Sequence, residues 1–211
     1  MKIDSPKISQ TLTAKNFNEI FYEEDPILED CIITESIFEN ETVGRVRLYN
    51  AVIKNSRFNG TDFSDIDLTD VCFENCDLSN ADLSKSSIHR VEFNNCKLVG
   101  VNFSEARMGN VQFNQSVLNL ATFGESKLEK VIFKDTSLKS TDFYNCKLKK
   151  VEYLLCNLDG ASFDGTLLKG IDISSSTFET LTVSIEGLTG CTVSSYQAIQ
   201  FASLMGLIVK D

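Results

Sequence analysis

The chain has 211 residues, of which 42% are hydrophobic and 24% are charged, a composition that supports a sizeable folded core and argues against a disordered chain. Its formal net charge of −10 disfavours direct binding to nucleic acid, because phosphates repel an acidic protein, but suits a partner with a basic surface. No stretch approaches the roughly 20 apolar residues of a membrane-spanning helix, and the start lacks the apolar core of a signal peptide, so we expect a cytoplasmic protein without membrane contact.

Residues 1–30 show none of the regular spacing that follows them. They contain both prolines of the chain, Pro6 and Pro26, and the acidic stretch NEIFYEEDP. Because the end of a repetitive fold exposes unpaired backbone, we expect this segment to fold over the first repeat as an N-terminal cap.

Residues 31–193 repeat with a period of five. Each fifth residue from Ile33 to Val193 is large and apolar, without exception over 33 positions. The residue two places earlier is usually small or β-branched, as at Ser56, Thr61 and Cys76, while the other three positions are mostly polar. Two positions in five therefore face inward and three face outward.

A period of five fits neither regular secondary structure. A helix with 3.6 residues per turn would carry the apolar stripe around its axis, and a strand alternates with a period of two. The in-phase motifs NCDLSNADLS and NCKLVGVNFS resemble instead the pentapeptide-repeat family. That resemblance implies an all-β fold, a right-handed quadrilateral β-helix in which four pentapeptides form one coil. The repeats then make about eight coils.

The central residues of the repeat carry a finer pattern. From residue 63 to 178 phenylalanine and leucine alternate at most of them, as at Phe63, Leu68 and Phe73. A period of ten in a coil of twenty residues places phenylalanine on two opposite sides, where the rings of successive coils stack and fill the interior. Glu41 and Glu186 stand at inward positions, and we expect the coil to loosen there. No insertion breaks the register between them, so no projecting loop is predicted.

Residues 194–211 change character. Ser194 or Ser195 suits a helix N-cap, residues 197–205 form an amphipathic pattern, and Gly206 suits the stop. This short C-terminal helix with its following strand either plugs the last coil or forms a two-fold dimer contact. The apolar side chains available for dimerisation are Ala198, Ile199, Phe201, Ala202, Leu204 and Met205.

The C-terminal tail resembles one particular group within the pentapeptide-repeat family. STFETLTVS followed by YQAIQFASLMGLIV resembles the C-terminal segment of chromosomal Qnr-like quinolone-resistance proteins of Gram-positive bacteria. That resemblance implies a homodimer that binds DNA gyrase and topoisomerase IV and protects them from fluoroquinolones, in some members as a mimic of B-form DNA. Transferable relatives carry projecting loops that contribute to protection. This sequence has none, so no loop residue can be carried over.

Catalytic chemistry has little support in the sequence. The one histidine, His89, is at an outward position without a nucleophile aimed at it. The seven cysteines match no paired zinc motif, and the repeat accounts for six of them as small inward residues, so we expect free thiols. We therefore predict no catalytic residue, no metal and no cofactor.

When charged residues are sorted by their position in the coil of twenty residues, one side is predicted to be acidic and the adjacent side basic. The acidic side surrounds the central residues at 63, 83, 103, 123, 143 and 163, and only Lys85 opposes its carboxylates. These are Asp62, Asp65, Asp82, Glu105, Glu125, Asp142 and Asp164. The basic side surrounds the central residues at 68, 88, 108, 128, 148 and 168 and carries eight lysines and arginines.

Either side can be a solvated face that keeps an edge-rich fold soluble. The functional alternative is an acidic stripe that docks on a basic DNA-binding saddle. The leading hypothesis is a topoisomerase-binding rod, and the alternative is an interaction scaffold for another cytoplasmic partner.

Overall fold

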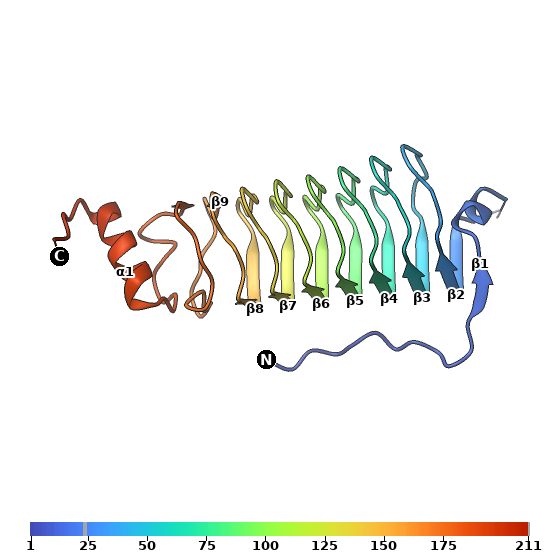
Figure 1. The fold of residues 1–211 in the computed structure, drawn as a ribbon, viewed down its shortest axis with the longest axis horizontal. Helices are drawn as coiled ribbons and strands as arrows, with labels where there is room; N and C mark the ends of the chain where they lie inside the picture. Colours follow the sequence, from blue (N-terminus) through green and yellow to red (C-terminus); the bar gives the residue numbers. More distant parts are fainter. Residues whose placement is uncertain (23–24, 211) are drawn as a thin grey trace.

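The computed structural model describes residues 1–22 and 25–210, which form a straight rod of parallel strands with a helix at its C-terminal end (Figure 1). The main sheet has eight strands in chain order, each hydrogen-bonded to the next. They are β1 (Thr13–Lys15), β2 (Ile27–Thr34), β3 (Arg47–Lys54), β4 (Asp67–Glu74), β5 (Ser87–Asn94), β6 (Arg107–Asn114), β7 (Lys127–Lys134) and β8 (Lys147–Leu154). A second pair, β9 (Ala161–Ser162) and β10 (Leu181–Thr182), lies toward the C-terminal end.

The register between strands is twenty residues. Leu48 pairs with Leu68, which pairs with Ile88, and isolated parallel bridges such as Asp62 to Asp82 keep the same offset elsewhere on the coil. Four pentapeptides therefore make one coil, and the chain is a parallel β-solenoid of about eight coils with one short C-terminal helix. This confirms the predicted fold class.

Corners occur at every fifth residue. Each such residue from Asp30 to Gly170 has a positive φ, and in 24 of them the residue is not glycine. Asparagine, aspartate and glycine adopt this left-handed conformation most readily, which explains why they are frequent there. Each turn of the backbone at a corner begins a new side, and four corners close one square coil.

The interior is filled by two ladders of aromatic rings. Phe73, Phe93, Phe113, Phe133 and Tyr153 stack on one side, with consecutive centroids 4.9–5.1 Å apart. A second ladder from Phe103 to Phe163 repeats this spacing, and rings of the two ladders meet edge to face at about 6 Å. The predicted phenylalanine sides are confirmed, and the stacks bind adjacent coils together.

The N-terminal segment, expected as a cap, divides into two parts. The 3-10 helix η1 (Phe17–Tyr22) buries Phe17 and Ile20 against the first coils, where Phe17 meets the ring of Phe38 at 4.7 Å. Residues 1–12, which we name the strap, instead run back beside the row of strands toward β8 (Figure 1).

Backbone N–H groups hold the strap on one corner of the rod. Ser9 donates to Asn50 Oδ1 at 2.7 Å, Lys7 to Asp70 Oδ1 at 2.8 Å and Asp4 to Asn110 Oδ1 at 3.1 Å. The three acceptors share one corner position in successive or alternate coils. Three extended residues span about 10 Å, close to two coil spacings of about 4.8 Å, so the strap fits the repeat.

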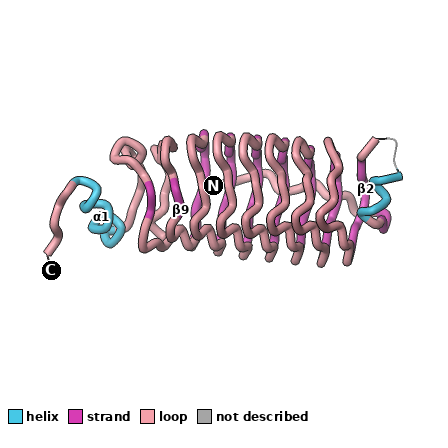
Figure 2. The backbone as a smooth tube through the Cα atoms, turned by 90° about the horizontal axis from the view of Figure 1, so that it is seen from above, coloured by secondary structure: helices cyan, strands magenta, loops and turns pink. Residues whose placement is uncertain are grey.

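The C-terminal end is closed by helix α1 (Ser195–Ala202), which continues into the 3-10 helix η2 (Ser203–Met205) beyond the last coil (Figure 2). Ser194 caps α1 through a reciprocal contact with Gln197, and Gly206 ends η2 in the left-handed conformation, as predicted.

The two inward glutamates behave differently from each other. Glu186 lies in an irregular turn and is exposed, in agreement with the expected loosening. At Glu41 the coil is loosened only in part: its carbonyl accepts the regular hydrogen bond from Asp62 N at 2.8 Å, but its own N–H lacks the turn bond to the carbonyl three residues earlier that Thr61 and Ala81 make. Its carboxylate is nevertheless exposed, because no regular coil precedes its own on that side.

Candidate interaction surfaces

The structure places the seven predicted acids on one side of the rod, in more than one column. Asp62, Asp82 and Asp142 share the column that runs along the bridges, with neutral Asn102 and Thr122 between them. The carboxylates of this column also fix the turns, because each accepts a hydrogen bond from the backbone N–H two residues later at 2.8–3.0 Å. They therefore have a structural role besides their charge.

The remaining acids of this side are more exposed. Asp65, Glu105 and Glu125 occupy the corner column between the acidic and the basic sides, with φ of 59° or 60°. Lys85 stands in the same column with the same backbone conformation. Asp164 is also exposed but lies one position before that corner. The corner carboxylates are thus the part of the acidic side that is free to meet a partner.

The basic side is uneven along the rod. In its N-terminal half, Arg90 donates two hydrogen bonds to Asp70, at 2.6 and 2.7 Å. The Arg90 guanidinium holds the pKa of the Asp70 carboxyl below its usual range, and the backbone N–H of Lys7 adds to this effect. From Arg107 onward, this side carries seven lysines and arginines and one acid of its own, Glu129, which pairs with Lys149 at 2.7 Å. Asp4 of the strap adds a second acid, which pairs with Lys130 at 3.8 Å.

The six predicted dimerisation residues fall into two groups, a pair that packs on the rod and four that are exposed to solvent. Ala202 is buried, and Phe201 packs against Phe178 with ring centroids 5.3 Å apart, so both contribute to closing the rod. Ile199 and Met205 are 52% and 60% exposed, and Ala198 and Leu204 are also exposed. The exposed apolar surface continues into residues 207–209. The expectation of a strand after the helix was wrong, because residues 207–210 form no strand.

Gln197 makes the polar contacts that the sequence reasoning missed at this end. Its buried amide donates to the carbonyls of Ile173 at 2.9 Å and Ser176 at 2.8 Å. These carbonyls belong to the last coils, and a following coil would otherwise satisfy them. The capping pair with Ser194 was the available signal, since it fixes the position of Gln197 in the first turn of the helix.

Residues for catalysis or metal binding do not gather within the described ranges. Among residues 1–22 and 25–210, no group of three or more His, Cys, Asp or Glu side chains is placed to hold a metal. His89 lies on β5, half-buried, with its ring next to Gly109 of β6. All seven cysteines are free thiols, five of them buried in the inward columns. Within the described part of the chain, no helix is long and apolar enough to cross a membrane.

These features define a class: a repeat solenoid in which each coil contacts only its neighbours and the outer sides present the chemistry. Two family models match the chain, pentapeptide repeats over residues 47–84 and a pentapeptide repeat region over residues 86–163. The chain belongs to the pentapeptide-repeat family.

Comparison with solved structures supports the same fold. A trypsin-treated form of QnrB1, a plasmid-mediated fluoroquinolone resistance protein, is 24% identical with a TM-score of 0.56, over 85% of this chain and 90% of that one. HetL from the cyanobacterium Nostoc, a pentapeptide-repeat protein involved in regulating heterocyst differentiation, is 15% identical with a TM-score of 0.60, over 85% and 91%. No curated protein matches the chain.

Proposed function

We propose that this protein is a non-enzymatic rod in the cytoplasm that binds the type II topoisomerases DNA gyrase and topoisomerase IV and protects them from fluoroquinolones. The observation that carries the proposal is the acidic side, a row of carboxylates along a straight rod. Such a surface offers a basic DNA-binding saddle the charge pattern of a nucleic acid, and long-range attraction would steer the encounter. The role of QnrB1 in fluoroquinolone resistance and the Qnr-like tail of this chain support the choice of partner.

A homodimer is part of this proposal. The exposed apolar residues of α1, η2 and residues 207–209 form a patch at the C-terminal end of the rod, and such patches commonly mark interfaces. Two rods of about eight coils joined end to end would extend about 80 Å, at about 4.8 Å per coil. Ile199→Asp combined with Met205→Asp should give a monomer in sedimentation equilibrium with an unchanged circular dichroism spectrum. A variant that remains dimeric would show that the helix is not part of the dimer interface.

The first experiment is gyrase supercoiling across a titration of this protein, with and without ciprofloxacin. Recovery of supercoiling in the presence of the drug supports protection. Inhibition without recovery indicates a competitor of DNA that does not protect. No change in either curve removes the topoisomerase proposal.

Charge reversal then tests the acidic side. Glu105→Lys with Glu125→Lys should weaken gyrase binding at least tenfold at low salt, and the rod should stay folded because Lys85 already occupies this corner column. The matched control is Glu35→Lys with Asp135→Lys, which changes net charge equally at exposed residues of the diagonally opposite corner. Equal effects of the two pairs would show that net charge, and not the acidic side, determines binding.

A second candidate is an interaction scaffold for a different cytoplasmic protein. The likeness to HetL favours it, because the same fold there carries an unrelated regulatory role. It predicts no effect on supercoiling with or without drug, together with a different partner recovered by cross-linking through the acidic side.

A further inference from the structure

The C-terminal half of the basic side has a surface that the proposed function does not use. Outward residues there form columns along the rod, because strands β6 to β8 pair in register. One column contains Arg107, Lys127 and Lys147, all exposed, and the corner column on the far side of Gly109 contains Lys130 and Lys150. The strap runs along that corner, and its Asp4 pairs with Lys130 at 3.8 Å. Among the described residues, no ion pair forms at Arg107, Lys127, Lys147 or Lys150 within 4.0 Å. Their charges are therefore available to a partner.

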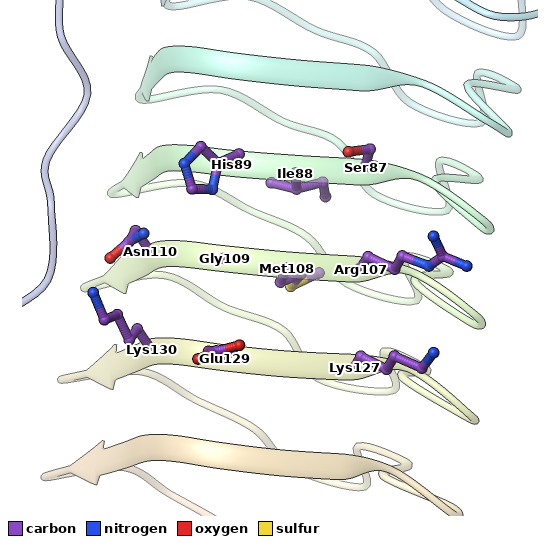
Figure 3. A pocket seen from close by; sticks show the side chains of 10 residues that line it. All are labelled: Ser87, Ile88, His89, Arg107, Met108, Gly109, Asn110, Lys127, Glu129 and Lys130. Atoms are coloured by element: carbon purple, nitrogen blue, oxygen red, sulfur yellow. The ribbon is translucent and has the colours of Figure 1, made fainter.

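A hollow interrupts this surface at Gly109. The column that contains His89, Gly109, Glu129 and Lys149 loses its side chain at the glycine, which leaves a shallow hollow of about 440 Å³. Figure 3 shows Arg107 and Lys127 at one end of the hollow and Asn110 and Lys130 at the other. The hollow thus has the unpaired cations Arg107 and Lys127 at one end, the strap-paired Lys130 at the other, and room for a side chain from outside.

We propose that this surface, from Arg107 to Lys150, docks an acidic α-helix of another protein, with one of its carboxylates seated over Gly109. The helix would lie along the rod axis. Its carboxylates at positions three or four residues apart recur about every 5.4 Å, which is close to the coil spacing of about 4.8 Å. Alternate residues of an extended peptide recur at about 6.7 Å and lose this match within two coils.

Charge distribution favours such a helix over nucleic acid. The exposed carboxylates of Glu105 and Glu125 run along the corner that borders the Arg107 column. A DNA duplex carries one charge per roughly 1.7 Å of its axis and presents phosphates all around, so it would also meet this acidic corner within the Debye length of about 8 Å. A helix with acids along one face places its charge on the basic side alone.

The test uses the full-length protein and a labelled 15-residue helical peptide with glutamates along one face. The control peptide has the same composition with the glutamates distributed around the helix. Fluorescence anisotropy at low salt should show the one-faced peptide binding at least fivefold more tightly than the control, with affinity falling as salt is added. Equal affinities of the two peptides, or no binding of either, would overturn the proposal.

Protein variants locate the contact. Arg107→Glu with Lys127→Glu should weaken binding of the one-faced peptide at least tenfold, whereas Lys134→Glu with Lys139→Glu, exposed cations on other sides, should change it less than twofold. Equal losses in the two pairs would reject the basic side as the docking surface.

A variant that fills the hollow tests whether a side chain of the peptide is seated there, as opposed to general electrostatic attraction to the basic side. Gly109→Val keeps the net charge and suits a strand, and only the nearby ring of His89 must shift, since a Cβ at this position would lie 3.0 Å from its Nδ1. Binding of the one-faced peptide should fall about fivefold in a protein of equal or greater stability. Unchanged binding would show that no carboxylate is seated over Gly109. Tighter binding of a 20-base-pair duplex than of the peptide would assign the surface to nucleic acid instead.

Discussion

Replacing Phe113 by alanine tests whether the aromatic ladders hold the coils together. Phe113 is fully buried, and its ring stacks between Phe93 at 4.9 Å and Phe133 at 5.0 Å. It also meets Phe103 and Phe123 edge to face. Removal of a buried phenylalanine from a packed core costs about 3–5 kcal/mol, and the four ring contacts place this site near the upper end. The loss is a large fraction of the stability of a typical domain, about 5–15 kcal/mol.

The assay is urea unfolding followed by circular dichroism, with hydrogen exchange to locate the damage. Because each coil contacts only its neighbours, β5 to β7 should lose amide protection before β3 does. The comparison variant is Phe178→Ala, near the end of the rod, where the ring has one aromatic neighbour at 5.3 Å. It should lose about 2–3 kcal/mol. A loss below about 2 kcal/mol at Phe113, or equal losses at both sites, would refute a stabilising role for the stacked rings.

Three further predictions concern the corners and the ends. Gly100→Ala should lower the free energy of unfolding by about 1–2 kcal/mol, because φ is +68° at this corner. Gly109→Ala, within β6, should leave the free energy of unfolding unchanged. Chemical denaturation of the two variants makes the comparison. Asp70→Ala, which removes the acceptor of the Lys7 N–H, should loosen the strap and raise its proteolysis. Arg90 lowers the pKa of Asp70 in the folded protein. The stabilisation from the ionised Asp70 is therefore complete above the pKa of the unfolded chain and is lost as the pH falls through the folded pKa. Acid should reduce the difference between the variant and the wild type. Gln197→Ala should cost about 2 kcal/mol and make residues 194–210 sensitive to protease while the coils stay protected.

Much of the fold was predictable because the period of five sets the inward columns directly. The coil of four pentapeptides came from the resemblance to the pentapeptide-repeat family, and the phenylalanine ladders follow from the alternation of phenylalanine and leucine within such a coil; the structure confirms all three. The corner rule was also present in the sequence, since Asn40, Asn50 and Asn55 occupy positions that later prove to have positive φ. Leu120 and Leu155 occupy the same conformation, which hid the rule from a reading based on composition alone.

The strap and the end contacts were not predictable in the same way. Asp4, Lys7 and Ser9 use backbone N–H groups to bind the rod, and backbone donors leave no mark on side-chain composition. Sorting charges by their position on the coil identified the acidic and basic sides. It did not show that Arg90 is neutralised by Asp70, whereas Arg107 forms no ion pair within 4.0 Å among the described residues. That difference arises from which side chains share a column in consecutive coils.

The position of the strap also orders the events of folding. Asp4 binds Asn110, 106 residues further along the chain, so its docking site does not exist until the sixth strand has joined the sheet. A chain that emerges from the ribosome with its N-terminus first therefore stacks its early coils before the strap can close on them. Once docked, the strap crosses several coils and ties them together along one corner, so separating any two of them also requires releasing the first residues to be synthesised.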